Sequence, residues 1–167
     1  MKKITIFKGF HFSNFFPKIY KSNKNFEKTV NICFDKSCAY DINEKSCVNK
    51  LWGFSSGLLG VHKNSYRFGW TYDKDTEQII IWTYLYINGR LYKKELTTCD
   101  FDTEYEFKIK IEQNDDSAKV VFKFNYLYTK VFDIPIKLNK YLLELGYYFG
   151  GKTRAPHKMN ILYKSFY

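Results

Sequence analysis

Residues 61–92 predict three consecutive β-strands joined by two polar turns, and no other stretch constrains the fold as strongly. From Tyr66 to Asp73, aromatic residues alternate with polar or small ones, the period of two that places successive side chains on opposite faces of a sheet. Residues 73–77 contain no apolar side chain and predict a turn. We therefore expect a strand with one aromatic face and one polar face.

The strand expected over residues 78–87 is apolar on both faces, which is typical of a strand inside a sheet. One face carries Ile79, Ile81, Leu85 and Ile87, and the other carries Ile80, Trp82, Tyr84 and Tyr86. Asn88 and Gly89 follow, and both tolerate the positive φ of a two-residue hairpin turn. Residues 90–96 are then expected to return as the third strand.

The rest of the chain favours β-structure as well. Apolar residues recur at helical spacing over residues 138–145, before Gly146, and this segment predicts the one short helix. Further strands are expected over residues 4–7, 10–12, 29–34, 105–112, 119–128, 130–134 and 157–167, with polar loops over 18–28 and 35–50. The fold class that follows is all-β: a two-sheet antiparallel jelly-roll sandwich with at most one short helix, in a single domain spanning residues 1–167.

Two features of the composition bear on the fold and on the partner. Aromatic residues make up 20% of the chain, which favours half-buried pleated surfaces over helices. The net charge of +10, from 27 basic and 17 acidic residues, predicts an anionic partner such as a nucleic acid. The lysine-rich and asparagine-rich usage of an AT-rich genome is the alternative explanation of this charge.

The N-terminal segment is not expected to be a signal peptide, because Lys8, Gly9 and Asn14 interrupt its apolar residues. No run approaches the roughly 18 apolar residues of a membrane helix. We expect a monomeric protein of the cytoplasm that binds no membrane and keeps its cysteines reduced. The cysteines lack a C-x-x-C spacing and no histidine is grouped with them, so we expect no metal and no cofactor. These residues are Cys33, Cys38, Cys47, Cys99, His11, His62 and His157.

Arginine is rare in this chain, with three copies against 24 lysines, and each arginine lies in a distinctive stretch. If the aromatic row of residues 66–72 faces the core, Arg67 faces outward beside the aromatic residues of the next strand. Such a surface stacks nucleobases and holds phosphates, or stacks on sugar rings. In the alternative, the aromatic residues form the core and the arginines form ordinary surface pairs. The candidate binding residues are Arg67, Trp82, Tyr84, Tyr86, Arg90, Lys152, Arg154, His62 and His157.

Three motifs of the chain resemble the concanavalin A-like or laminin G-like jelly-roll family. They are Arg67-Phe68-Gly69-Trp70, Tyr84-x-Tyr86-x-Asn88-Gly89-Arg90 and the strand over residues 105–112. The resemblance covers roughly residues 50–167, and residues 147–157 also look like a closing motif of small uncharacterised proteins of bacteria and their phages. This family implies the sandwich fold but no settled activity.

Residues 146–153, GYYFGGKT, match the letters of a phosphate-binding loop. That loop joins a parallel strand to a helix, whereas the surrounding pattern is antiparallel and Pro156 blocks a helix. We interpret Gly150 and Gly151 as a tight turn whose backbone amides bind an anion weakly.

Catalytic patterns are weak, so the sequence favours a non-enzymatic protein. The expected central strands carry no paired acids for a glycosidase, and the Gln-x-His and Arg-x-Glu strands of alginate lyases are missing. The leading hypothesis is a basic binding protein that acts on a nucleic acid or nucleoprotein complex. A phage-encoded inhibitor of a host defence system, such as an anti-CRISPR protein, is one form of it. The alternative is a glycan-binding, lectin-like module or a jelly-roll polysaccharide lyase.

Overall fold

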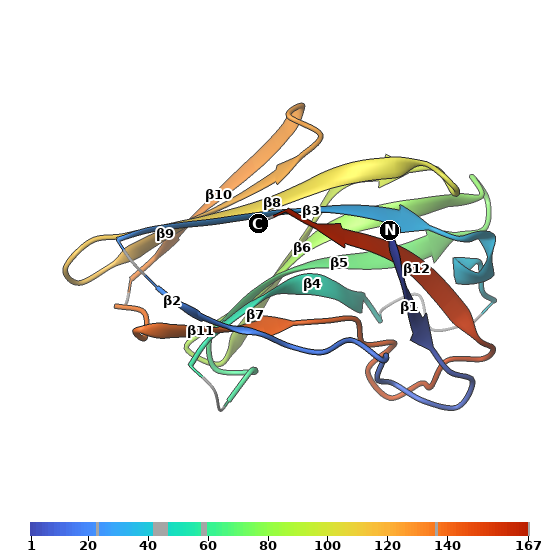
Figure 1. Cartoon of the computed structure of the whole chain (residues 1–167), viewed down its shortest axis with the longest axis horizontal. Coiled ribbons are helices and arrows are strands. Elements are labelled where there is room, and N and C mark those ends of the chain that lie inside the picture. Colours follow the sequence, from blue (N-terminus) through green and yellow to red (C-terminus); the bar gives the residue numbers. More distant parts are fainter. Residues whose placement is uncertain (23, 42–46, 58–59, 136, 167) are drawn as a thin grey trace.

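The structure is a computed structural model that describes residues 1–22, 24–41, 47–57, 60–135 and 137–166. Within these residues, twelve strands form two antiparallel six-stranded sheets stacked as a sandwich (Figure 1). The first sheet has the order β1 (Lys2–Ile6), β12 (Met159–Ser165), β3 (Asn25–Phe34), β8 (Glu104–Gln113), β9 (Ala118–Phe124), β10 (Tyr128–Ile134). The second has the order β2 (Ile19–Lys21), β11 (Tyr141–Leu145), β4 (Asn49–Ser56), β5 (Ser65–Asp73), β6 (Gln78–Ile87), β7 (Arg90–Cys99). The expected all-β, two-sheet antiparallel sandwich is confirmed.

Strands β5, β6 and β7 form the predicted pair of hairpins. Strand β6 is paired on both sides, as its two apolar faces indicate. Asn88 and Gly89 form the turn between β6 and β7 with φ values of 50° and 78°. Positive φ at both central residues gives this turn the twist of the flanking strands, which explains the Asn-Gly sequence.

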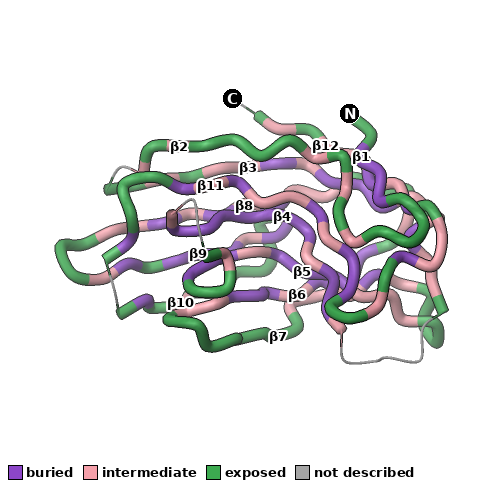
Figure 2. The backbone as a smooth tube through the Cα atoms, turned by 90° about the horizontal axis from the view of Figure 1, so that it is seen from below, coloured by how far each residue is buried: buried purple, intermediate pink, exposed green. Residues whose placement is uncertain are grey.

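The register between β5 and β6 places the aromatic row of β5 inside the sandwich. Tyr66, Phe68 and Trp70 are fully buried, and they pack with buried residues of both sheets in one hydrophobic core. Rings of the two sheets meet there edge to face, as Phe68 does with Phe107 at a centroid distance of 5.0 Å. Figure 2 shows these buried positions along the central strands of both sheets.

Strand β11 replaces the short helix that was expected over residues 138–145. It pairs with β2 on one side and with β4 on the other, so its residues alternate between the two faces of the sheet. Leu142 and Glu144 face the core, whereas Leu143 and Leu145 face outward. The backbone pairing of β11 with β2 and β4 therefore outweighs the helical spacing of the leucines. Among the described residues, the one helical element is the 3₁₀ turn η1 (Lys36–Cys38).

Three boundaries in the rest of the chain differ from the expectation. Residues 10–12 form no regular strand, and Phe12 makes only an isolated bridge with Tyr148. The expected loop over residues 18–28 contains β2 and the start of β3, because Tyr20 and Phe26 pack against the core while their neighbours in sequence are exposed. The strand expected over residues 119–128 ends at Phe124, where Asn125 and Tyr126 turn the chain with positive φ. Residues 42–46 of the other expected loop, and Tyr167, lie outside the described residues.

In the part of the chain that the structure describes, no helix is long and apolar enough to cross a membrane.

Glu144 is a buried carboxylate that ties β11 to both sheets. Its Oε1 accepts hydrogen bonds from Trp52 Nε1 at 2.9 Å and from the Tyr163 hydroxyl at 3.1 Å, and its Oε2 accepts one from the Tyr20 hydroxyl at 3.2 Å. Burial, together with the charge of Glu144 and this hydrogen bond, raises the pKa of Tyr20 to about 12, so the hydroxyl keeps its proton and remains a donor. The carboxylate is thus buried inside the sandwich, where it accepts three hydrogen bonds.

We predict that Glu144→Ala lowers the free energy of unfolding by about 3 kcal/mol or more, because buried donors lose their acceptor. Glu144→Gln, which retains one acceptor oxygen, should lose less. Urea denaturation measures both variants, with Glu95→Ala on the exposed face of β7 as a control that changes stability by less than about 0.5 kcal/mol. Equal stability of Glu144→Ala and the control would contradict this role of Glu144.

Candidate functional site

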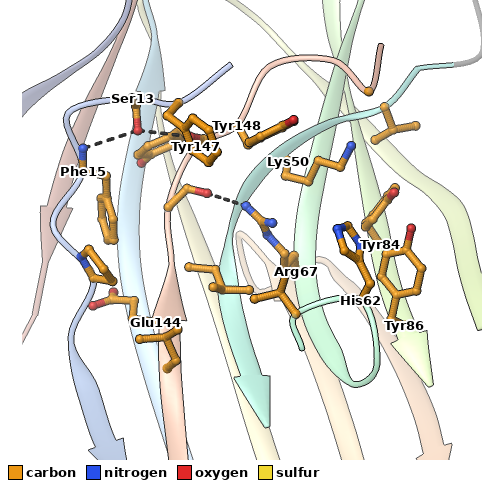
Figure 3. Close-up of a pocket in the computed structure, with 18 of the residues that line it drawn as sticks. Ser13, Phe15, Lys50, His62, Arg67, Tyr84, Tyr86, Glu144, Tyr147 and Tyr148 are labelled. Atoms are coloured by element: carbon orange, nitrogen blue, oxygen red, sulfur yellow. Dashed lines mark hydrogen bonds between the residues drawn. The ribbon is translucent and has the colours of Figure 1, made fainter. Parts of the chain in front are cut away.

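A cavity of about 770 Å³ opens on the outer face of the second sheet (Figure 3). Its floor is formed by outward-facing residues of five strands, and its walls come from four segments of the chain. Floor residues are Lys50, Arg67, Tyr84, Tyr86, Leu91, Lys93, Leu143 and Leu145. The walls include Phe12, Ser13, Phe15, Pro17, Cys47, Val48, Val61, His62, Tyr147, Tyr148 and Gly151.

Strand pairing aligns the floor residues in rows that cross the sheet. The middle row runs from Leu145 through Gly53, Arg67 and Tyr84 to Lys93, with each residue opposite the next on the neighbouring strand. Paired residues of antiparallel strands share a face of the sheet. Arg67 therefore lies in this row with Leu145 toward one end and Tyr84 toward the other. The middle row therefore carries two cations across the floor.

Lys50 reaches the same floor from β4 because of a bulge. The register between β4 and β5 shifts by one residue between Lys50 and Gly53, so Leu51 and Trp52 are both buried while Lys50 stays on the outer face. Its Nζ lies 5.1 Å from the ring centroid of Tyr84 and 5.4 Å from that of Tyr148. The ammonium is held between two aromatic rings and also donates to the carbonyl of Gly150 at 3.0 Å.

Arg67 is fixed in place by a backbone carbonyl instead of a carboxylate. Its Nη2 donates to the carbonyl oxygen of Gly146, whereas its buried Nε has no hydrogen-bond partner among the described residues. Burial lowers the pKa of Arg67 to about 10. Burial also lowers the pKa of Lys50, and the positive charges of Arg67 and Lys93 add to this effect. Arg67 and Lys50 are thus two like charges that are partly removed from water, whereas Lys93 is exposed.

Gly146 lets the wall pack closely against the floor. A Cβ at this position would lie 2.3 Å from ring atoms of Phe15, so only glycine admits that ring over the backbone whose carbonyl holds Arg67. The wall segment is held further by Ser13, whose hydroxyl donates to the carbonyl of Tyr147 at 3.1 Å, and by His11, whose ring stacks on Tyr148 at a centroid distance of 5.1 Å.

Glu144 is the one acidic residue among the described residues that line the cavity. Its carboxylate points away from Arg67, as Figure 3 shows, and is bonded to Trp52, Tyr20 and Tyr163 inside the sandwich. The described lining therefore presents three cationic side chains and no carboxylate. No group of three His, Cys, Asp or Glu side chains among the described residues is arranged to hold a metal ion.

The structure brings together four of the nine predicted binding residues. His62, Arg67, Tyr84 and Tyr86 line the cavity, and the rings of His62 and Tyr86 meet edge to face at 5.1 Å. Trp82 lies on the same face of β6 but outside the cavity, where its Nε1 donates to the hydroxyl of Thr71 at 2.9 Å. Arg67 does face outward beside Tyr84, as the period of two predicts.

The other four predicted residues lie away from the cavity. Arg90, Lys152 and Arg154 are exposed and absent from its lining. His157 lies near η1, where a ring nitrogen is 2.8 Å from the carbonyl oxygen of Ser37. The structure therefore does not bring these four residues together with the residues that line the cavity.

Sequence reasoning missed Lys50, Lys93, Tyr148 and the wall residues Phe12 and Phe15. Lys50 depends on a bulge, and the wall depends on contacts between residues about 130 positions apart, such as Ser13 with Tyr147. A local signal for Lys93 was present in the sequence. In the expected hairpin over residues 78–96, Lys93 pairs with Tyr84 and therefore shares its face of the sheet.

The backbone amide of Gly150 is not the free anion donor that we expected. It donates to Oδ1 of Asn49 at 2.6 Å, so it is already occupied. The turn itself is present: Gly150 has a φ of 66°, and a Cβ there would lie 2.0 Å from the carbonyl oxygen of Thr153.

Comparison with known proteins identifies similar folds but no family. No protein-family model matches the chain, and no curated protein matches it either. A functionally unknown protein from Saccharomyces cerevisiae has a similar structure, with a TM-score of 0.52 and 9% identity over 96% of this chain and 83% of that chain. This similarity concerns the fold alone. A carbohydrate-binding module from Bacillus subtilis aligns with a TM-score of 0.35 and 13% identity over 91% of this chain and 75% of that chain, which is too low to support an argument. Membership of the concanavalin A-like family stays a prediction.

We predict that Arg67→Met leaves the free energy of unfolding unchanged or raises it. The variant keeps an unbranched aliphatic stem and removes a desolvated cation that lacks an acidic partner among the described residues. Urea denaturation measures the effect against Arg90→Met, which removes the same charge at an exposed position of β7. A loss of more than about 2 kcal/mol in Arg67→Met alone would show that Arg67 is a structural residue.

Proposed function

We propose that this protein is a non-enzymatic glycan-binding protein and that the cavity on the second sheet is its binding site. The observation that carries the proposal is a cavity of about 770 Å³ that combines tyrosine rings with convergent hydrogen-bond donors. Cavities that hold one small ligand or a short oligomer span roughly 300–1,000 Å³ and have this mixture of aromatic and polar lining.

A sugar ring fits both kinds of group in this lining. The C–H faces of a pyranose pack on the electron-rich faces of aromatic rings, and Tyr84, Tyr86 and Tyr148 supply such rings on two sides. Sugar hydroxyls require donors and acceptors at the ring edge, which Lys50 and the phenol hydroxyls provide. A flat apolar ligand would leave these polar groups unpaired, whereas a glycan pairs them.

The absence of catalysis is part of the proposal, and two features support it. Glu144 is the one acid in the described lining and is bonded inside the sandwich, so it forms no acid pair with another lining residue. Burial raises the pKa of Tyr84 far above its usual value, so its phenol keeps its proton at neutral pH and is poorly suited as the base of a lyase. An unsaturated sugar product formed from an acidic polysaccharide would overturn this part of the proposal.

Nucleic acid is the second candidate partner, and the net charge of +10 favours it. A single strand stacks its bases on aromatic rings and its phosphates on cations, as the cavity floor also permits. Three basic residues that we expected at the site, Arg90, Lys152 and Arg154, are not among the residues that line the cavity, however. That the partner belongs to a host defence complex stays a prediction, because no feature of the cavity identifies such a complex.

We predict that the purified protein binds members of an immobilised panel of neutral and acidic oligosaccharides, and that Tyr148→Ala weakens binding about tenfold. The matched control is Tyr126→Ala, which removes an exposed tyrosine at the β9–β10 turn of the other sheet. Isothermal titration with the glycan that binds most tightly in the panel gives the affinities of the wild-type protein and the two variants.

A single-stranded DNA and a single-stranded RNA in the same panel decide between the two partners. Glycan binding should persist between about 50 and 200 mM salt, whereas a complex held by phosphate contacts loses most of its affinity over this range. Binding of nucleic acid alone, or equal effects of Tyr148→Ala and Tyr126→Ala, would refute a glycan site in this cavity.

A further inference from the structure

We propose that the cavity selects acidic sugars and that Arg67 and Lys50 bind the anionic group, a carboxylate or a sulfate. This inference rests on the proposed glycan-binding function and names the substrate class of that site. It predicts that the same sugar without its charge is a poor ligand.

The charge of the lining is one-sided. Arg67 and Lys50 bring two positive charges to one floor, and the one acid in the described lining, Glu144, has its carboxylate hydrogen-bonded to Trp52, Tyr20 and Tyr163 in the interior. In most protein sites a buried cation is accompanied by an acid, because an uncompensated buried charge is costly. Here the described lining supplies no such acid to Arg67 or Lys50, so an anionic ligand would complement these two cations.

Both cations are oriented but keep donors for a ligand. The Arg67 guanidinium is anchored through one nitrogen, Nη2, to the Gly146 carbonyl, and a guanidinium carries five N–H donors in total. Lys50 donates to the Gly150 carbonyl, and an ammonium carries three N–H groups. Neutral carbonyls thus fix both groups without cancelling their charge. This is the arrangement that preorganised anion sites require.

The aromatic rings place the anionic group relative to the sugar. Lys50 lies between the rings of Tyr84 and Tyr148, and Tyr84 lies directly opposite Arg67 on the neighbouring strand. Lys50 and Arg67 thus lie beside the same tyrosine, Tyr84, and we infer that a sugar ring packed against the tyrosines in the cavity presents its anionic substituent to both cations. Stacking and charge recognition act on one residue of the glycan, and the combination gives specificity that neither provides alone.

An anion would also offset the cost of holding these two cations in the cavity. Burial lowers the pKa of both Arg67 and Lys50, and repulsion by Arg67 contributes for Lys50, which means that their charged forms are less favoured here than in water. A bound anion stabilises these charged forms, so its binding should raise the thermal stability of the protein.

The test compares oligosaccharides that end in glucuronate or galacturonate with the same compounds ending in glucose or galactose. Isothermal titration should give at least about tenfold tighter binding of the acidic member of each pair, the usual range for one or two charge-assisted hydrogen bonds. A glucose-terminated compound that carries a sulfate distinguishes the two anionic groups. Equal affinity for acidic and neutral members would overturn the proposal while leaving glycan binding intact.

Variants locate the preference within the cavity. Arg67→Met should abolish it, and Arg67→Lys should restore part of it because the charge returns without the planar fork. Lys50→Met is a second variant with the same expected loss. Arg90→Met is the matched control, since it removes an equal charge outside the cavity. Equal losses in Arg67→Met and Arg90→Met would show that general electrostatics, and not this cavity, produces the preference.

A separate arm uses sodium glucuronate, sodium sulfate and sodium chloride in a thermal-shift measurement without any oligosaccharide. A rise in melting temperature with the first two salts, lost in Arg67→Met, supports the anion site even if no glycan of the panel binds. In that case the proposed glycan function fails and the anion site stands. No rise beyond that of sodium chloride, together with no acidic preference in titration, overturns the anion site.

Discussion

The antiparallel register between β5 and β6 determines which side chains enter the core and which reach the cavity. Tyr66, Phe68 and Trp70 pack inside the sandwich because they share a face with Leu85 and Ile81. The same register places Arg67 opposite Tyr84 on the outer face. A shift of one residue would exchange the two faces of β5: Arg67 would point into the core and the aromatic row would face outward. The register that the core requires therefore also determines which residues form the cavity floor.

The same alternation along β11 places Glu144 and its neighbouring leucines on opposite faces of the sheet. Glu144 points inward to three donors, while Leu143 and Leu145, its neighbours in sequence, form the apolar side of the cavity. The carboxylate of the one acid in the described lining thus lies in the interior, and the charged side chains of the described floor are Lys50, Arg67 and Lys93. Under the proposed function, this separation suits the cavity to an anionic ligand and lowers the stability of the protein, a trade-off common at binding sites.

Local patterns were sufficient for the fold and for the middle of the floor, but not for the walls. Period-two alternation correctly assigned the faces of β5 and β6, and Asn88-Gly89 correctly marked their return, because both signals act over a few residues. The helix expected over residues 138–145 was wrong because its leucines serve two faces of a strand whose partners, β2 and β4, are distant in sequence. The position of Lys50 on the outer face depends on the β-bulge in β4, and the position of the Phe15 ring depends on the absence of a side chain at Gly146. Neither feature can be predicted from a short stretch of sequence.

The most direct test of the account is a crystal structure of the protein bound to an oligosaccharide that ends in glucuronate. The account predicts that the sugar occupies the outer face of the second sheet, with its carboxylate at hydrogen-bond distance, about 3 Å, from both Arg67 and Lys50. Its ring should pack against Tyr84 or Tyr148. A sugar bound on the first sheet or at the exposed arginines, or a carboxylate that points to solvent within the cavity, would contradict it.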